Sequence, residues 1–313
     1  MDKIKELSKL IGNTPLLKIR YRHNGKTKNI YVKLEYYNLT GSIKDRVALG
    51  IISNSLNDGS LEPHQTLVET TSGNMGISFS AIGAYLGHKV VIFMPEFMSE
   101  ERKALLKLYG AELHLTKDFP HAFKEAKEYA NQNNGFLTLQ FDNKYNILTH
   151  YSTTAKEIAN KIPSPKAFIA GVGTAGTLMG IGSYLKNKYG AYVIALEPAN
   201  SQILSSGKSK GHHKLQGLSD QIIPSIYDKN LVDTIVSVTD EDAIAMAQKL
   251  AREFGLGVGI SSGANFVGAV QYGKSNTITV FTDDNKKYMS TDLTTPITTP
   301  FVNSIQLIDY VVI

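Results

Sequence analysis

The sequence predicts an α/β protein in which parallel sheets are covered by helices on both faces. Short apolar runs alternate with amphipathic stretches along most of the 313 residues, and small polar or glycine-rich turns follow several of the runs. Alternation of this kind is typical of strand–helix–strand units. A chain of this length can bury a large core, and it shows neither an internal repeat nor a low-complexity linker. We therefore expect two lobes built from such units.

The expected elements alternate along the chain. The expected strands are 31–36, 66–70, 90–94, 111–115, 136–139, 167–170, 192–196 and 277–281. The expected helices are 100–109, 121–131, 148–161, 177–188 and 240–254. The stretch 201–225 has little periodicity and suggests a long active-site loop. We expect an enzyme domain over 8–293 with a smaller mobile lobe at about 47–150, the remainder forming a larger lobe, and an irregular C-terminal extension over 294–313.

Composition excludes several classes of function. The formal net charge is +5, but the lysines are scattered rather than clustered with aromatic residues, so we expect no nucleic-acid partner. The absence of cysteine excludes disulfides, thiolate metal sites and a cysteine nucleophile, and we expect no metal. No apolar run is long enough to span a membrane, and the first residues lack the pattern of a signal peptide. We expect a cytoplasmic protein without a membrane partner.

Lys44 is the strongest candidate for a catalytic residue. It lies at the expected start of a helix, directly after the strand-like run 31–36, where the helix dipole favours a neutral, nucleophilic amine. A second signal follows at 70–76, where a strand ends in a small polar turn that opens another helix and could hold a carboxylate on its N–H groups. Either feature alone is usually structural. Together they favour pyridoxal-phosphate chemistry on an amino acid.

A glycine-rich loop at 171–177 follows one expected strand and opens the next helix. It satisfies the G-x-G-x-x-G pattern, and Glu197 ends the next strand, so a nicotinamide-dependent oxidoreductase is a competing hypothesis. The hydroxyls of Thr174 and Thr177 favour a terminal monophosphate over a bridging pyrophosphate. The dinucleotide hypothesis also gives no role to Lys44.

With these elements in order, the chain resembles the cysteine synthase (O-acetylserine sulfhydrylase) and cystathionine β-synthase family. The similarity runs from 11–16, Ile-Gly-Asn-Thr-Pro-Leu, to 287–291, Lys-Tyr-Met-Ser-Thr, which is nearly the whole chain. The resemblance implies the two-lobed tryptophan-synthase-β-like fold of the fold type II enzymes and pyridoxal 5'-phosphate as cofactor. It also implies a homodimer, and it allows a serine acetyltransferase partner.

The resemblance assigns roles to individual residues. Lys44 would hold the cofactor covalently, Asn74 would lie beside its phenolic oxygen, and Ser261 would face its pyridine nitrogen. The sequence alone favours a helix cap at Ser261, and the resemblance reverses that preference. The phosphate loop would comprise Gly173, Thr174, Ala175, Gly176 and Thr177. The substrate carboxylate would be held by Thr71, Ser72, Met75 and Gln140.

Three features depart from the family pattern. Met75 replaces a threonine that is usual in the turn, which removes a hydroxyl donor. The segment 140–147 lacks the prolines commonly found there. Asp220 stands where typical cysteine synthases carry glycine or alanine, so it is either a catalytic acid near the β carbon or a surface acid.

The resemblance therefore implies β-elimination and replacement on a serine- or cysteine-type amino acid, with cysteine made from O-acetylserine or O-phosphoserine and sulfide. Alternatives within this chemistry are a cysteine lyase that releases hydrogen sulfide and forms serine, and a cystathionine β-synthase-like enzyme. Outside it are the nicotinamide-dependent oxidoreductase and a catalytically inactive, ligand-binding homologue. The leaving group, the nucleophile and the physiological direction do not follow from the sequence.

Overall fold

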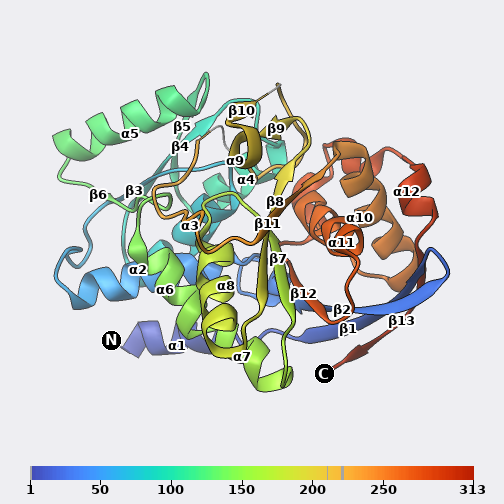
Figure 1. Cartoon of the computed structure of the whole chain (residues 1–313). Helices are drawn as coiled ribbons and strands as arrows, with labels where there is room; N and C mark the ends of the chain where they lie inside the picture. The colour runs from blue at the N-terminus through green and yellow to red at the C-terminus, as the bar shows by residue number, and fades with distance from the viewer. Residues whose placement is uncertain (1, 210, 220–221) are drawn as a thin grey trace.

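Two sheets, each covered by helices, form the framework of the molecule (Figure 1). The structure is a computed structural model that describes residues 2–209, 211–219 and 222–313. The larger sheet has seven strands and the smaller has four. In the described part of the chain, no helix is both long and apolar enough to cross a membrane. The predicted α/β class with predominantly parallel sheets is confirmed.

The larger sheet is parallel over five of its strands and antiparallel at one edge. Its order is β11 (Thr234–Val238), β8 (Tyr192–Pro198), β7 (Ala167–Gly171), β12 (Thr277–Phe281), β2 (Lys26–Leu34), β1 (Leu16–His23) and β13 (Gln306–Val312). Side chains alternate between two cores, since Ile169 packs in one and Phe168 and Ala170 in the other. Helices α10 (Asp240–Phe254) and α11 (Ile260–Tyr272) cover one face. Helices α7 (Thr154–Lys161) and α8 (Gly176–Tyr189) cover the other.

The smaller sheet is parallel throughout. Its order is β5 (Glu112–Thr116), β4 (Val90–Pro95), β3 (Leu67–Thr70) and β6 (Phe136–Leu137). Helices α2 (Lys44–Asn57), α3 (Asn74–Leu86) and α4 (Glu100–Leu108) share one core with it, and α5 (Phe119–Gln132) packs on the opposite face. The remaining elements are short or peripheral: α1 (Asp2–Leu10), α6 (Lys144–Ser152), β9 (Ser201–Gln202), α9 (Ile203–Ser206), β10 (Lys208–Ser209) and α12 (Pro300–Asn303).

Two expectations about individual elements were wrong. The single helix expected over 148–161 is two helices, α6 and α7, because Thr153 adopts φ −119° and ψ −78° between them. The C-terminal extension is not irregular throughout, since β13 pairs antiparallel with β1 at the edge of the larger sheet. The smaller sheet lies within 47–150, while the boundaries of the two lobes stay a prediction.

The connections place several strand ends against one cleft. Strand β3 ends at Thr70 and is followed by the turn that opens α3, while β7 ends at Gly171 and is followed by the loop that opens α8. In open parallel sheets, ligands bind at the carboxyl ends of the strands. The fold therefore brings the two turns singled out in the sequence to the same region.

Candidate active site

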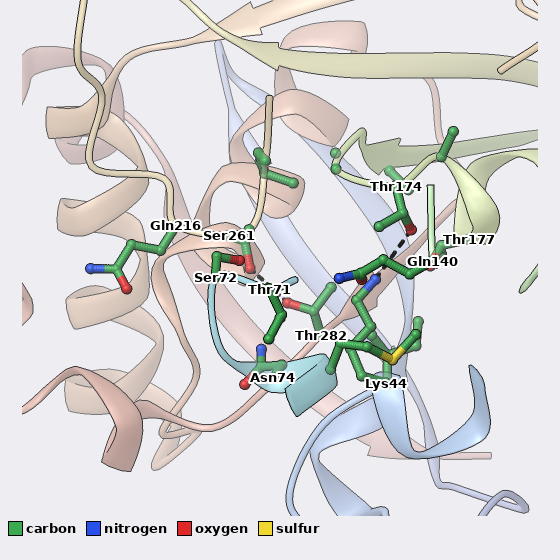
Figure 2. A pocket seen from close by; sticks show the side chains of 18 of the residues that line it. Lys44, Thr71, Ser72, Asn74, Gln140, Thr174, Thr177, Gln216, Ser261 and Thr282 are labelled. Carbon is green, nitrogen blue, oxygen red and sulfur yellow. Dashed lines mark hydrogen bonds between the residues drawn. The ribbon is translucent and has the colours of Figure 1, made fainter. Parts of the chain in front are cut away.

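One pocket collects nearly all of the predicted site residues (Figure 2). Its lining includes Lys44, Thr71, Ser72, Asn74, Met75, Gln140, Gly173, Thr174, Ala175, Thr177 and Ser261. Gly176 is the first residue of α8, directly between Ala175 and Thr177. Asp220 lies outside the described residues. The pocket thus joins segments that are far apart in the sequence, and the role of each residue stays a prediction.

Lys44 is the first residue of α2, as the sequence predicted. The helix start is held from both sides, because Asp45 accepts hydrogen bonds from the Thr40 N–H (2.7 Å) and the Ser78 hydroxyl (2.7 Å). Arg46 forms ion pairs of 2.6 Å with the carboxylates of Glu35 and of Glu157. These buried contacts fix the position from which the Lys44 side chain enters the pocket. Its amine donates to the Thr174 hydroxyl at 3.5 Å (Figure 2).

The glycine loop approaches its neighbours so closely that side chains would not fit. A Cβ on Gly173 would lie 2.1 Å from the carbonyl oxygen of Gly217, and one on Gly176 would lie 1.8 Å from Oδ1 of Asn146. Ala175 adopts a left-handed conformation with φ 67° as the N-cap of α8. Ala175 and Thr177 line the pocket at this helix start, and the N–H groups of a helix start commonly bind a phosphate.

Two buried side chains behind the loop were missed from the sequence. The Asn146 amide donates to the Thr174 hydroxyl (2.9 Å) and to the Gln140 carbonyl (2.9 Å), while its Oδ1 has no partner in the described part of the chain. Nε2 of His150 lies 3.4 Å from the Thr177 hydroxyl. Burial lowers the pKa of His150 to about 3, so this imidazole is neutral at physiological pH. Asn146 falls within the segment 140–147, whose unusual composition was the available signal.

The turn after β3 forms the opposite wall. Thr71 accepts a hydrogen bond from the Gly73 N–H at 3.0 Å, and Gly73 has φ 147°, a conformation that side chains rarely adopt. Asn74 begins α3. Its amide nitrogen donates to Asp283 at 2.8 Å, and none of the residues that the structure describes is a partner for its Oδ1. The N–H groups at the start of α3 make this wall suitable for a carboxylate.

Gln140 is tied to this turn through buried polar groups. Its side-chain amide donates to the Thr70 carbonyl at 3.0 Å. Glu69, which is completely buried, accepts from the Thr70 N–H at 2.7 Å and also from the Thr138 hydroxyl. Burial raises the pKa of Glu69 to about 7. Glu69 therefore links the carboxylate turn to the segment that carries Gln140.

Ser261 is the second residue of α11, and its hydroxyl lies 2.6 Å from the hydroxyl of Thr282. The N-cap of α11 is Gly259, so Ser261 is not the helix cap that the sequence alone allowed. Thr282, Arg102 and Gln216 also line the pocket and were not predicted. Arg102 had no usable signal, because an arginine in an expected helix is usually solvated.

The chain belongs to the pyridoxal-phosphate dependent enzyme family, whose match covers residues 7–283. A cysteine synthase of Staphylococcus aureus is 41% identical over 301 residues, which are 93% of this chain and 97% of that protein. A hydrogen sulfide-producing enzyme from Fusobacterium nucleatum is 43% identical with a TM-score of 0.95, covering 100% of this chain and 99% of the other. An aspartate-to-asparagine variant of that enzyme, solved with an α-aminoacrylate intermediate, gives 42% identity and a TM-score of 0.96 over 100% of both chains.

The residues of the pocket fit this cofactor. A phosphate requires a cradle of backbone, and Gly173 and Gly176 let the loop pack so closely against Gly217 and Asn146 that a Cβ at either position would collide with them. A polar ring requires hydrogen-bonding partners, and the buried Oδ1 atom of Asn74, which lines the pocket, has none among the described residues. Lys44 supplies an amine beside both. The prediction of pyridoxal phosphate as cofactor is confirmed by the family.

Glu197 has a structural role instead of the one that the oxidoreductase hypothesis required. It is completely buried and accepts hydrogen bonds from the Leu204 N–H (2.9 Å) and from the Ser205 hydroxyl. Both oxygens are thus engaged at the start of α9, so none is presented to a ribose. The family match replaces the oxidoreductase hypothesis.

Proposed function

We propose that this protein catalyses β-elimination and replacement on a serine- or cysteine-type amino acid, with cysteine made from O-acetylserine or O-phosphoserine and sulfide as its principal reaction. The observation that carries the proposal is one pocket in which the Lys44 amine lies between the loop 173–177 and the turn 71–75. The 41% identity to a cysteine synthase over 93% of this chain supports the choice of reaction.

Each wall of the pocket has a separate task in this proposal. The backbone of 173–177, with the hydroxyls of Thr174 and Thr177, holds the phosphate. Asn74 and Ser261 contact the ring. When bound, the cofactor withdraws electrons from the α carbon of the amino acid and so weakens its bond to the α proton. Lys44 would hold the cofactor covalently, and its free amine would take that proton as a general base.

The substrate is held by its carboxylate. Thr71, Ser72 and the N–H groups at the start of α3 bind it from one side, and Gln140 binds it from the other. Met75 is almost completely buried in this wall and offers no hydroxyl, so recognition there depends more on backbone donors. With the carboxylate fixed, the β substituent would face residues 216–218, which line the same pocket.

The opposite direction, release of hydrogen sulfide from cysteine, is the second candidate. It is favoured by the match to the hydrogen sulfide-producing enzyme, which extends over 100% of this chain and 99% of that enzyme. Asp220 provides a chemical reason: an acid near the β carbon could activate water or orient the hydroxyl of serine, and it would repel hydrosulfide and O-phosphoserine. Both directions use the same carboxylate site and Lys44.

The deciding experiment compares wild type with Asp220→Ala and Asp220→Asn in two assays: sulfide release from cysteine, and cysteine formation from O-acetylserine and sulfide. If Asp220 supports sulfide release, both variants lose that activity more than they lose cysteine formation. Equal effects on the two assays, or no effect on either, leave cysteine synthesis as the function and remove Asp220 from the mechanism. Wild type that is inactive in both assays would contradict the proposed function.

Further parts of the proposal concern assembly and location. A homodimer and a serine acetyltransferase partner follow from the resemblance alone, and a cytoplasmic location follows from the sequence pattern; all three stay predictions. A cystathionine β-synthase-like activity is tested by adding homocysteine to either assay. If cystathionine forms faster than cysteine, the physiological nucleophile is a larger thiol and not sulfide.

A further inference from the structure

Three buried polar atoms without a hydrogen-bond partner belong to one connected group beside the pocket. Among the residues that the structure describes, these are Asn74 Oδ1, Asp283 Oδ1 and Arg102 Nε. Asn74 and Arg102 both line the pocket. Asp283 joins them, because it contacts the Asn74 amide at 2.8 Å and lies 3.9 Å from the Arg102 guanidinium. Unpaired buried polar atoms are costly, so such a concentration of them points to a functional role.

Asp283 dictates how the Asn74 amide is oriented. The Asp283 side chain is completely buried, just after β12, and its Oδ2 accepts from the Asn74 nitrogen and from the Tyr288 hydroxyl, both at 2.8 Å. An ionised carboxylate can only accept hydrogen bonds, so the amide nitrogen of Asn74 must face Asp283. The other N–H and the Oδ1 atom of Asn74 are then the groups that remain for a ligand.

Arg102 supplies the opposite charge. Its side chain is 2% exposed, and its guanidinium lies 4.5 Å from the centre of the Tyr288 ring. It donates to the Ser99 hydroxyl at 3.3 Å and to the side-chain oxygen of Gln216. A buried carboxylate without a nearby cation would be strongly destabilised. Arg102 therefore places a positive charge 3.9 Å from the buried Asp283 carboxylate.

Arg102 also contacts the turn that precedes Asn74. A Cβ on Gly73 would lie 2.1 Å from Cδ of Arg102, so the arginine side chain packs directly on the turn backbone. The group thus links the smaller lobe, through α4 and the turn, to the segment after β12 in the larger lobe. Asp283 contacts both Asn74 and Arg102, and Arg102 also packs on the backbone of the turn.

We propose that Asp283, with Arg102 as its counter-charge, is a positioning residue that fixes the Asn74 amide and thereby sets the hydrogen bonding available to the ring oxygen of the cofactor. This rests on the proposed function, in which Asn74 contacts that oxygen. The hydrogen bonding and protonation of a phenolic oxygen conjugated to the ring determine where the ring absorbs. The cofactor spectrum therefore reports on Asp283 without any turnover of substrate.

The test measures the visible absorption spectrum between pH 6 and 9 and the dissociation constant of the cofactor for the holoenzyme of Asp283→Asn. The matched control is Asp284→Asn, the same substitution one residue later, where the carboxylate contacts Lys287 (3.4 Å) and the Lys286 N–H (3.1 Å). An asparagine at 283 can pair with Asn74 in either orientation. We expect a shifted or newly pH-dependent band and a dissociation constant raised about tenfold, with the control unchanged. A wild-type spectrum and affinity in Asp283→Asn would overturn the proposal.

Two further measurements separate positioning from simple structural support. The double variant Asp283→Asn, Asn74→Ala should have the spectrum of Asn74→Ala alone, because Asp283 acts through Asn74; additive changes would contradict this. In the unsubstituted holoenzyme, the Asn74 side-chain amide protons should exchange slowly with solvent in NMR spectra, and fast exchange of both would overturn the proposal even if Asp283→Asn fails to fold. A wild type that binds the cofactor but lacks β-replacement would contradict the proposed function alone.

Discussion

The turn after β3 and the loop after β7 are both strand-to-helix connections that face the same pocket, yet they are built differently. The loop 173–177 is shaped by backbone: Ala175 is left-handed, and side chains on Gly173 or Gly176 would collide with buried neighbours. The turn 71–75 combines the left-handed Gly73 and the backbone N–H groups of the helix start with side-chain groups: the Thr71 hydroxyl is bonded within the turn, and the Asn74 oxygen has no partner among the described residues.

This difference separates a constant part of the site from a variable one. A backbone cradle recognises the same phosphate whatever the sequence around it, whereas a side-chain wall changes with each substitution. The relatives accordingly include a cysteine synthase and a hydrogen sulfide-producing enzyme at similar identity, 41% and 43%. We infer that the loop fixes the cofactor class, while the turn and the facing loop decide which amino acid is processed. Four predictions test this division.

Lys44→Ala should have the largest effect, because in the proposed mechanism Lys44 both holds the cofactor and takes the α proton of the amino acid. We expect turnover to fall by at least about 10³-fold, the range for loss of a general base, in any assay that wild type performs. Lys44→Arg, which keeps the positive charge but cannot anchor the cofactor, should be equally inactive. Full turnover in Lys44→Ala would contradict the mechanism.

Gly176→Val should disturb the loop 173–177, where we expect the cofactor phosphate to bind. A Cβ there would lie 1.8 Å from the buried Asn146, so the loop or Asn146 must shift and the phosphate cradle is distorted. We expect the cofactor dissociation constant to rise on the order of 100-fold, the loss of about 3 kcal/mol of hydrogen bonds to a charged group. Gly190→Ala, at the other end of α8 with open space around it, is the control. It should keep the cofactor, and equal losses in both variants would refute a specific phosphate role.

Thr71→Val should weaken binding of the amino acid at the turn 71–75 and leave binding of the cofactor unchanged. The substitution preserves shape but removes the hydroxyl that accepts from the Gly73 N–H. We expect the KM for the amino acid to rise about tenfold while the cofactor dissociation constant is unchanged, since one hydrogen bond to a charged group is worth about 1.5–3 kcal/mol. Steady-state kinetics and cofactor titration on the same preparation measure both. Loss of cofactor affinity without a change in KM would reverse the assignment of the two walls.

The smallest expected effect is on the pH dependence of the unfolding free energy, to which the buried Glu69 contributes. The pKa of Glu69 is raised from 4.5 to about 7 in the folded state, so the folded protein binds a proton that the unfolded chain releases. The resulting stabilisation is fully present below pH 4.5 and is lost as the pH rises through 7. It amounts to about 3 kcal/mol at most, at about 1.4 kcal/mol per pKa unit.

Glu69→Gln isolates this contribution. His150, whose pKa is lowered to about 3, produces the opposite slope below pH 6.5 in both proteins and cancels in the comparison. The difference in unfolding free energy between wild type and Glu69→Gln should therefore shrink as the pH rises from 5 to 8. Urea denaturation at several pH values measures it. A difference that is independent of pH would show that Glu69 does not change its protonation in this range.

The sequence predicted the parts of the fold and site that depend on local pattern. Apolar alternation identified most strands, and the polar turns identified Lys44, the turn 71–75 and the loop 171–177, all of which meet in one pocket. Local pattern cannot show which distant side chains complete a site. Asn146, Arg102 and Asp283 were missed because their importance depends on burial and on partners brought together only by folding. The strand β13 was missed because the prolines and threonines at 294–300 made the whole tail look irregular, although 306–312 is rich in apolar residues.

The central claim is that Lys44 anchors the cofactor between the two walls, and labelling tests it most directly. The purified holoenzyme is reduced with borohydride, digested, and mapped by mass spectrometry for the lysine that carries the pyridoxyl group. We predict that the label lies on Lys44, in the peptide that begins α2. A label on any other lysine, such as the exposed Lys214 at the outer edge of the cleft, would contradict the account.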